Sequence, residues 1–156
     1  MSEIQYSLAG EEDILTLVNY RVAFLLEIMG PQTEAQIDLL TQHLENYFRN
    51  ALRDKIYICW LAVCDGAIVG VGGMTIRVQP GNFKNPNGRM GYIMNMYTIP
   101  SFRRQGICNQ LMNRLMDTGR AMGIQAFELH ATKDGEPVYQ KIGFEKHHDP
   151  TYRRYD

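Results

Sequence analysis

A strand, a helix and a second strand follow one another in the second half of the chain, and this order constrains the fold more than any other feature. Residues 90–98 show an extended pattern that Pro100 ends. Residues 104–122 place apolar side chains on one helical face, and Gly123 stops that helix. Residues 126–130 form a further strand. Such a connection joins two parallel strands through a right-handed helical crossover, which indicates an α/β fold.

The first half of the chain predicts antiparallel strands and two helices. Asp65-Gly66 is a tight-turn signal between two runs that are rich in β-branched and aromatic residues. This order predicts a mixed, mostly antiparallel central sheet with helices on both faces, in three α-β-α layers, within a single domain over residues 1–156. The further predicted elements are strands 4–8, 56–63, 67–78 and 144–148, helices 10–29, 33–53 and 135–141, and a tail, 149–156, that either pairs at a sheet edge or frays.

Charge and cysteine content exclude several classes of protein. The 16 Lys and Arg residues balance 17 Asp and Glu, and a formal net charge of −1 argues against a nucleic-acid binder. No apolar run reaches the roughly 18 to 20 residues that cross a membrane, and the N-terminus carries Glu3 without the positive charge of a signal peptide. Cys59, Cys64 and Cys108 form no Cys-x-x-Cys pair, so we expect no disulfide framework and no metal site. These features indicate a cytoplasmic protein with reduced thiols.

The stretch FRRQGICNQL, residues 102–111, lies where the crossover passes from strand to helix. Free backbone N–H groups at a helix N-terminus favour an anion, and a phosphate is the obvious ligand. Gly106 allows a close backbone approach, and Arg103 and Arg104 supply charged donors. The stretch matches neither the Walker loop nor the dinucleotide-binding fingerprint. An ordinary capped helix with two solvated arginines explains the same residues, so the pattern by itself leaves both interpretations open.

Two motifs resemble those of the GNAT acetyltransferases. Residues 103–108 read Arg-Arg-Gln-Gly-Ile-Cys and are similar to the family's acyl-CoA-binding motif, Gln/Arg-x-x-Gly-x-Gly/Ala, although Cys108 stands where Gly or Ala is usual. Residues 139–144 are similar to the family's Tyr-x-x-x-Gly-Phe signature. The element order fits as well, including the two helices after the first strand. The resemblance implies an acetyl-CoA-dependent N-acetyltransferase that needs no metal and transfers the acetyl group by direct attack in a ternary complex.

The resemblance also implies roles for individual residues. Tyr139 would act as the general acid that protonates the leaving thiolate; packing against Phe144 is the structural alternative. The residues implied in acetyl-CoA binding are Met96, Tyr97 and Thr98 at the pantetheine arm, and Arg103, Arg104, Gln105, Gly106, Ile107, Cys108 and Asn109 at the pyrophosphate.

The general base and the acceptor are not specified by these motifs. Some family members carry a glutamate at the position that Tyr92 occupies here. A water-mediated relay through Tyr92, Asn95, His130 or a backbone carbonyl is the remaining route for deprotonation. Glu27 would attract a cationic amine, whereas Arg21 on the same helix would favour an acidic acceptor. We therefore expect an amine-bearing small molecule or peptide as partner, and the sequence does not identify it.

Two other functions fit parts of the sequence. A non-catalytic acyl-CoA-binding or sensory module would keep Arg103 and Gly106 without needing Tyr139. A small nucleotide-binding protein would use the same helix N-terminus for a different phosphate. An edge strand at the C-terminus would also allow a homodimer.

Overall fold

Five strands form one mixed sheet in the order β1-β2-β3-β4-β5. In this computed structural model, which describes residues 2–156, the first four strands pair antiparallel and β4 pairs parallel to β5. The parallel pair confirms the predicted crossover. Met1, the first residue of the predicted domain, lies outside the described range. The strands are β1 (Gln5–Leu8), β2 (Tyr57–Cys64), β3 (Ala67–Val78), β4 (Arg89–Thr98) and β5 (Ala126–Leu129).

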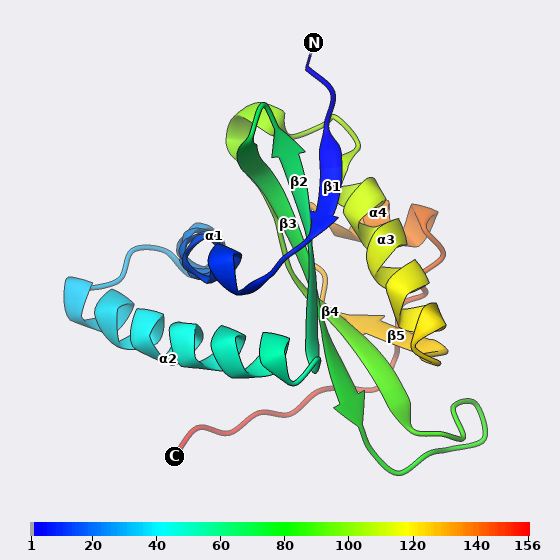
Figure 1. Cartoon of the computed structure of the whole chain (residues 1–156). Helices are drawn as coiled ribbons and strands as arrows, with labels where there is room; N and C mark the ends of the chain where they lie inside the picture. The colour runs from blue at the N-terminus through cyan, green and yellow to red at the C-terminus, as the bar shows by residue number, and fades with distance from the viewer. Residues whose placement is uncertain (1) are drawn as a thin grey trace.

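Helices cover both faces of this sheet. Figure 1 shows α1 and α2 on one side and α3 and α4 on the other, which confirms the three predicted layers. Within residues 2–156, no helix is long and apolar enough to cross a lipid bilayer. The helices are α1 (Ile14–Met29), α2 (Glu34–Arg53), α3 (Ile107–Ala121) and α4 (Glu136–Lys141), with short 3₁₀ turns η1 (Glu11–Asp13) and η2 (Pro100–Phe102).

The start of α3 differs from the prediction by three residues. We expected the helix from Arg104, but it begins at Ile107. Arg104 and Gly106 have left-handed backbone conformations, with φ of 62° and 79°, and such residues cannot continue a right-handed helix. The residues between η2 and α3 therefore form a loop whose conformation depends on the glycine.

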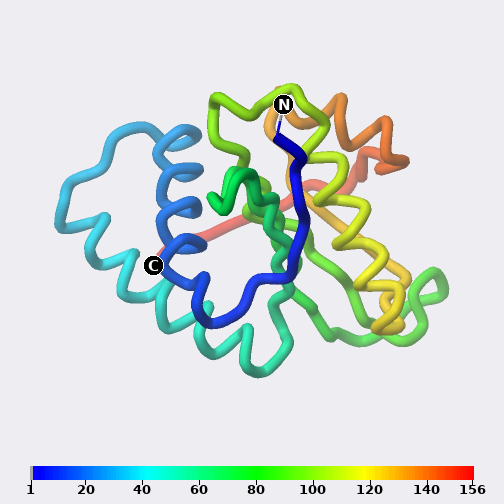
Figure 2. The backbone as a smooth tube through the Cα atoms, turned by 45° about the horizontal axis from the view of Figure 1, so that its top comes forward, coloured from blue at the N-terminus to red at the C-terminus, as the bar shows by residue number. Residues whose placement is uncertain are grey.

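The predicted strand at 144–148 is wrong. No part of residues 144–156 pairs with a strand in the described structure. Phe144 instead packs against the core on the α3 side, with its ring centroid 6.4 Å from that of Tyr139. The neighbouring strand β5 has only four residues, so it offers a short edge for pairing. Both Figure 1 and Figure 2 show the tail extending to a C-terminus on the α1/α2 side of the sheet.

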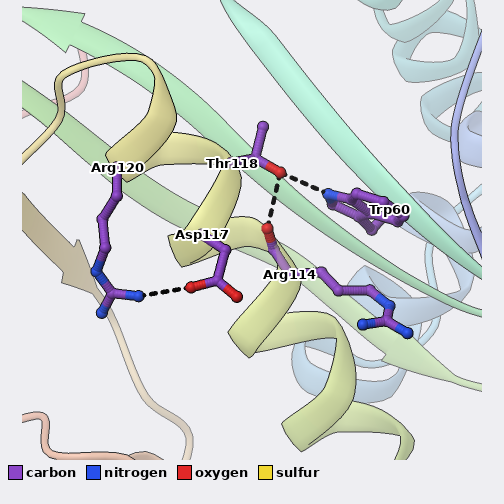
Figure 3. Close-up of polar contacts among 5 residues, drawn as sticks. All are labelled: Trp60, Arg114, Asp117, Thr118 and Arg120. Atoms are coloured by element: carbon purple, nitrogen blue, oxygen red, sulfur yellow. Dashed lines mark hydrogen bonds and ion pairs between the residues drawn. The ribbon is translucent and has the colours of Figure 1, made fainter.

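Polar contacts fix α3 against β2, in addition to its buried apolar face. The indole N–H of Trp60 donates to the hydroxyl oxygen of Thr118 over 2.9 Å, and that hydroxyl donates to the carbonyl of Arg114 over 2.8 Å (Figure 3). The Arg114 guanidinium lies over the ring of Tyr6, 4.4 Å from its centroid. These contacts set the position of α3 along the sheet, and with it the position of the loop before its first turn.

Each side of the sheet has its own core. Between the sheet and α1 and α2, the buried residues include Val18, Phe48, Tyr57 and Leu61. On the other side, α3 buries Leu111, Met112 and Leu115 against the sheet, with exposures of 0%. Burial of this extent makes α3 the helix whose packing most directly determines the fold on that side.

Replacing Leu111 by Ala is expected to lower the free energy of unfolding by about 2–5 kcal/mol, because it leaves a cavity beneath α3. Leu39→Ala is the matched control, since Leu39 is 59% exposed on α2 and its truncation removes little buried surface. Urea unfolding followed by circular dichroism measures both. Equal unfolding midpoints for the two variants would contradict this account of the core.

Candidate active site

Strand β4 has an irregularity near its centre in its pairing with β3. Gly73 pairs with Met94 and Val71 pairs with Tyr97, so two residues of β4 face one residue of β3. Asn95, one of these two, has a left-handed φ of 56°. This is a β-bulge, which bends the strand that carries it.

Beyond the bulge, no strand in the described part of the chain pairs with β4 on the side away from β3. The last residue pair between β4 and β5 is Ile93 with Leu129, yet β4 continues to Thr98. Residues 94–98 therefore present main-chain groups toward the space that β5 would occupy if it were longer. Main-chain groups at such a position need partners from water or from a ligand. Met96, Tyr97 and Thr98, which the motif comparison assigns to the pantetheine arm, all lie in this segment.

The loop formed by residues 103–108, which we call the glycine loop, presents unused backbone donors. Among the described residues, no amide N–H from residue 104 to residue 109 donates to a protein acceptor; the first such bond runs from Gln110 to the carbonyl of Gly106. A Cβ added to Gly106 would meet no atom within 4 Å, so the space above the loop is open. Open amides at the N-terminus of a fifteen-residue helix, beside the exposed Arg104, are suited to a diphosphate.

The side chain of Arg103 contacts two protein groups. Its Nε donates to the carbonyl of Thr98 over 2.8 Å, and its Nη2 lies 2.7 Å from Oε1 of Glu27. Nη1 remains for a ligand. Glu27, which we had considered as an attractor for a cationic amine, is therefore held by a cation of the protein itself. This ion pair ties the C-terminal half of α1 to the glycine loop.

Tyr139 lies beside the glycine loop, on α4. Its ring packs on the same core as Cys108, which is in the first turn of α3. Burial, with a smaller contribution from Cys108, raises the pKa of Tyr139 to about 12, so the phenol keeps its proton at neutral pH. The hydroxyl has no hydrogen-bond partner among residues 2–156 and is not among the fully buried unpaired atoms, so it can reach a ligand. Burial also raises the pKa of the Cys108 thiol, which is therefore neutral.

The residues considered for deprotonation lie further along the sheet, and two of them touch. The hydroxyl of Tyr92 lies 2.7 Å from Nδ1 of His130, which directly follows β5. Asn95 points elsewhere: it is 7% exposed, its Nδ2 donates to the Tyr57 hydroxyl over 2.9 Å, and its buried Oδ1 has no donor among the described residues. The structure thus brings Tyr92 and His130 together, with Asn95 in a separate contact.

One neighbour of this pair was not found by sequence reasoning. The guanidinium carbon of Arg77 lies 3.7 Å from the centroid of the Tyr92 ring, which is a close cation–π contact. Arg77 is on β3, and only the pairing register of β3 with β4 places it there. Its position in an alternating strand pattern carried no signal of a site, since exposed arginines are common in strands.

The chain belongs to the GNAT family of acetyltransferases. The model of the acetyltransferase (GNAT) family matches residues 22–144, which include β4, the glycine loop and Tyr139. No curated protein sequence matches the chain.

Solved structures agree with this assignment. A predicted acetyltransferase from Clostridium acetobutylicum with acetyl-CoA is 30% identical, with a TM-score of 0.89 over 97% of this chain and 96% of that one. A GCN5-related N-acetyltransferase from Ralstonia eutropha is 24% identical, with a TM-score of 0.87 over 97% and 99%. A ribosomal-protein-alanine N-acetyltransferase from Brucella melitensis is 18% identical, with a TM-score of 0.73 over 99% and 100%. The last two show a shared fold.

Replacing Gly106 by Ala is expected to raise the Kd for CoA about tenfold, because an alanine disfavours the left-handed backbone by about 1–2 kcal/mol and would re-aim the loop amides. Gly30→Ala is the matched control: Gly30 also has φ of 80° and nothing within 4 Å of an added Cβ, but it lies at the end of α1. Isothermal titration calorimetry with CoA measures both variants. The same Kd for both would show that the glycine loop does not bind the diphosphate.

Proposed function

We propose that this protein is an N-acetyltransferase that moves an acetyl group from acetyl-CoA to an amine by direct attack in a ternary complex. The observation that carries the proposal is the row of open amides in the glycine loop, next to the unpaired half of β4. A phosphate-binding loop and an unpaired strand together suit a cosubstrate that has a diphosphate at one end and an amide-containing arm at the other. Acetyl-CoA has this form, and it supplies an acetyl thioester.

The proposed binding residues divide into two groups. The glycine loop and Asn109 would hold the diphosphate, with Arg104 and the free Nη1 of Arg103 as charged donors. Main-chain groups of Met96, Tyr97 and Thr98 would bind the pantetheine arm. A main-chain N–H at the bulge would also stabilise the developing oxyanion, and a preorganised donor of this kind is worth about 3–4 kcal/mol.

Tyr139 is the proposed general acid. A thiolate is a better leaving group when it receives a proton as the carbon–sulfur bond breaks, and a phenol with a raised pKa is fully protonated for that purpose. Its hydroxyl is unpartnered within residues 2–156, and its ring is held by Phe144 and the α3 core. The packing of the Tyr139 ring against Phe144, the structural alternative, is therefore compatible with a hydroxyl that donates its proton.

The Tyr92–His130 pair is the proposed route for the proton of the amine. An alkylamine must lose a proton before it can attack, since its pKa is about 10. The Tyr92 hydroxyl and Nδ1 of His130 are 2.7 Å apart. This hydrogen bond allows a proton that one of the two side chains takes from a bound water to pass to the other. This pair takes the place of the glutamate that some family members have at the Tyr92 position.

The test of the proposed function is a free-thiol release assay with acetyl-CoA and a panel of amines, run alongside calorimetric binding of CoA and ATP. We expect CoA to bind, ATP not to compete, and thiol release to depend on an amine. CoA binding with no release for any amine would favour the non-catalytic acyl-CoA-binding module. Displacement of CoA by ATP would favour the nucleotide-binding alternative.

Replacing Tyr139 by Phe is expected to lower kcat by about 10²–10⁴-fold, because the leaving thiolate loses its proton donor. The Kd for CoA should stay the same, since the ring and its packing remain. Tyr152→Phe, at an exposed position of the tail, is the control. An unchanged kcat in the Tyr139 variant would remove the proposed acid.

Replacing Tyr92 by Phe or His130 by Gln is expected to lower kcat/KM by about 10- to 100-fold, since either change breaks the relay. The double variant should lose little more than either single variant, because the two residues act as one unit. His43→Gln, on the exposed surface of α2, is the control. Losses that multiply in the double variant would show that the pair does not act together.

A further inference from the structure

We infer that the acceptor is a small amine that also carries a carboxylate, and that Arg21 and Arg77 bind this carboxylate beside Tyr92. The inference rests on the proposed function and names the substrate class for the same site. It is carried by two guanidinium groups near Tyr92, in the paired half of β4, that have little contact with carboxylates of the protein.

Arg21, on α1, is a half-buried cation that forms no ion pair with any residue from 2 to 156. Every ion pair among the described residues involves other groups, and no hydrogen bond from its guanidinium to residues 2–156 occurs. Burial lowers the pKa of Arg21, an effect that the nearby phenols of Tyr57 and Tyr92 partly offset. A guanidinium that is partly withdrawn from water and has no partner gains more from binding an anion than a solvated one does.

Arg77 supplies a second guanidinium against Tyr92, the phenol that also acts on Arg21. Stacking on the Tyr92 ring at 3.7 Å fixes the plane of its guanidinium group. Its contact with Glu128 is long, at 3.9 Å, and both side chains are about half exposed, so this ion pair is weak. The Tyr92 ring thus orients the N–H donors of Arg77, and the weak contact with Glu128 leaves these donors available to a ligand.

Strand register places these groups on one side of the sheet. Thr75 pairs with Tyr92, and Arg77 follows Thr75 by two residues, so the side chains of Arg77 and Tyr92 share a face. The hydroxyl of Thr75 contacts Tyr47 of α2, which identifies this face as the α1/α2 side. Tyr92 also touches His130, so the proposed carboxylate site adjoins the proposed proton relay.

The two arginines have one carboxylate partner between them among residues 2–156. Glu128 is the only carboxylate among the described residues that pairs with either arginine, and it pairs with Arg77 alone. Glu27, the acidic residue that the sequence offers for the acceptor site, is held by Arg103 at 2.7 Å. Glu27 predicted a cationic acceptor and Arg21 an acidic one. Because Glu27 is already paired and Arg21 is not, we infer that the acceptor carries an anionic group.

The experiment compares amino carboxylates with their amides. Glycine, β-alanine, γ-aminobutyrate and ε-aminocaproate, each with its own amide, are tested for thiol release and for calorimetric binding to the CoA-loaded protein. We expect at least one carboxylate to exceed its amide in kcat/KM by about 10- to 100-fold, the range expected for a charge-assisted contact. The member of the series with the largest ratio gives the distance between the amine and the carboxylate.

Substitutions of the two arginines test whether they cause the preference for a carboxylate over its amide. Arg21→Gln and Arg77→Gln should each reduce the carboxylate-to-amide ratio, while Arg21→Lys should restore part of it and report on folding. The Kd for CoA should stay unchanged in all three, and the ratio of a carboxylate to its own amide cancels any loss of turnover that affects both substrates. Arg120→Gln, which removes an exposed cation of α3 that pairs with Asp117, is the control and should leave the ratio as it is.

Three outcomes would overturn the inference. Equal use of carboxylates and amides by the unaltered protein would overturn it while the proposed function stands. A carboxylate preference that persists in both Gln variants would place the carboxylate elsewhere. No turnover and no binding of any amine by the CoA-loaded protein would overturn the inference together with the proposed function.

Discussion

The loss of pairing along β4 is the constraint on which the rest of the structure depends. The bulge at Asn95 gives β4 an extra residue against β3, and β5 ends before β4 does. Main-chain groups of residues 94–98 are left without a strand on that side, and such groups must find partners elsewhere. A ligand with amides of its own can supply these hydrogen bonds.

Helix α3, which follows β4, positions the glycine loop beside the unpaired segment of β4. Helix α3 is held by a fully buried face and by the bond from Trp60 to Thr118, so its N-terminus stays in one place relative to β4 (Figure 3). Arg103 adds its bonds to Thr98 and Glu27, which hold the start of the glycine loop. Its amides remain free for a ligand because the protein gives them no acceptor within residues 2–156.

The errors of the sequence-based prediction have identifiable causes. The start of α3 was placed too early because apolar periodicity does not reveal a left-handed residue such as Arg104. The strand at 144–148 was wrong because an extended pattern needs a partner edge, and a partner is a property of the tertiary structure. Most other elements were predicted within a few residues, since long periodic segments and a turn such as Asp65-Gly66 depend on local sequence.

The sequence by itself determined the crossover, the glycine loop and the two family motifs, because backbone conformation and apolar spacing are local properties. Only the tertiary structure decided which charged side chains are free. It paired Arg103 with Glu27, stacked Arg77 on Tyr92 and left Arg21 without a carboxylate partner among residues 2–156. These residues lie on different strands and helices, and the register that brings them together is set by packing across the whole sheet.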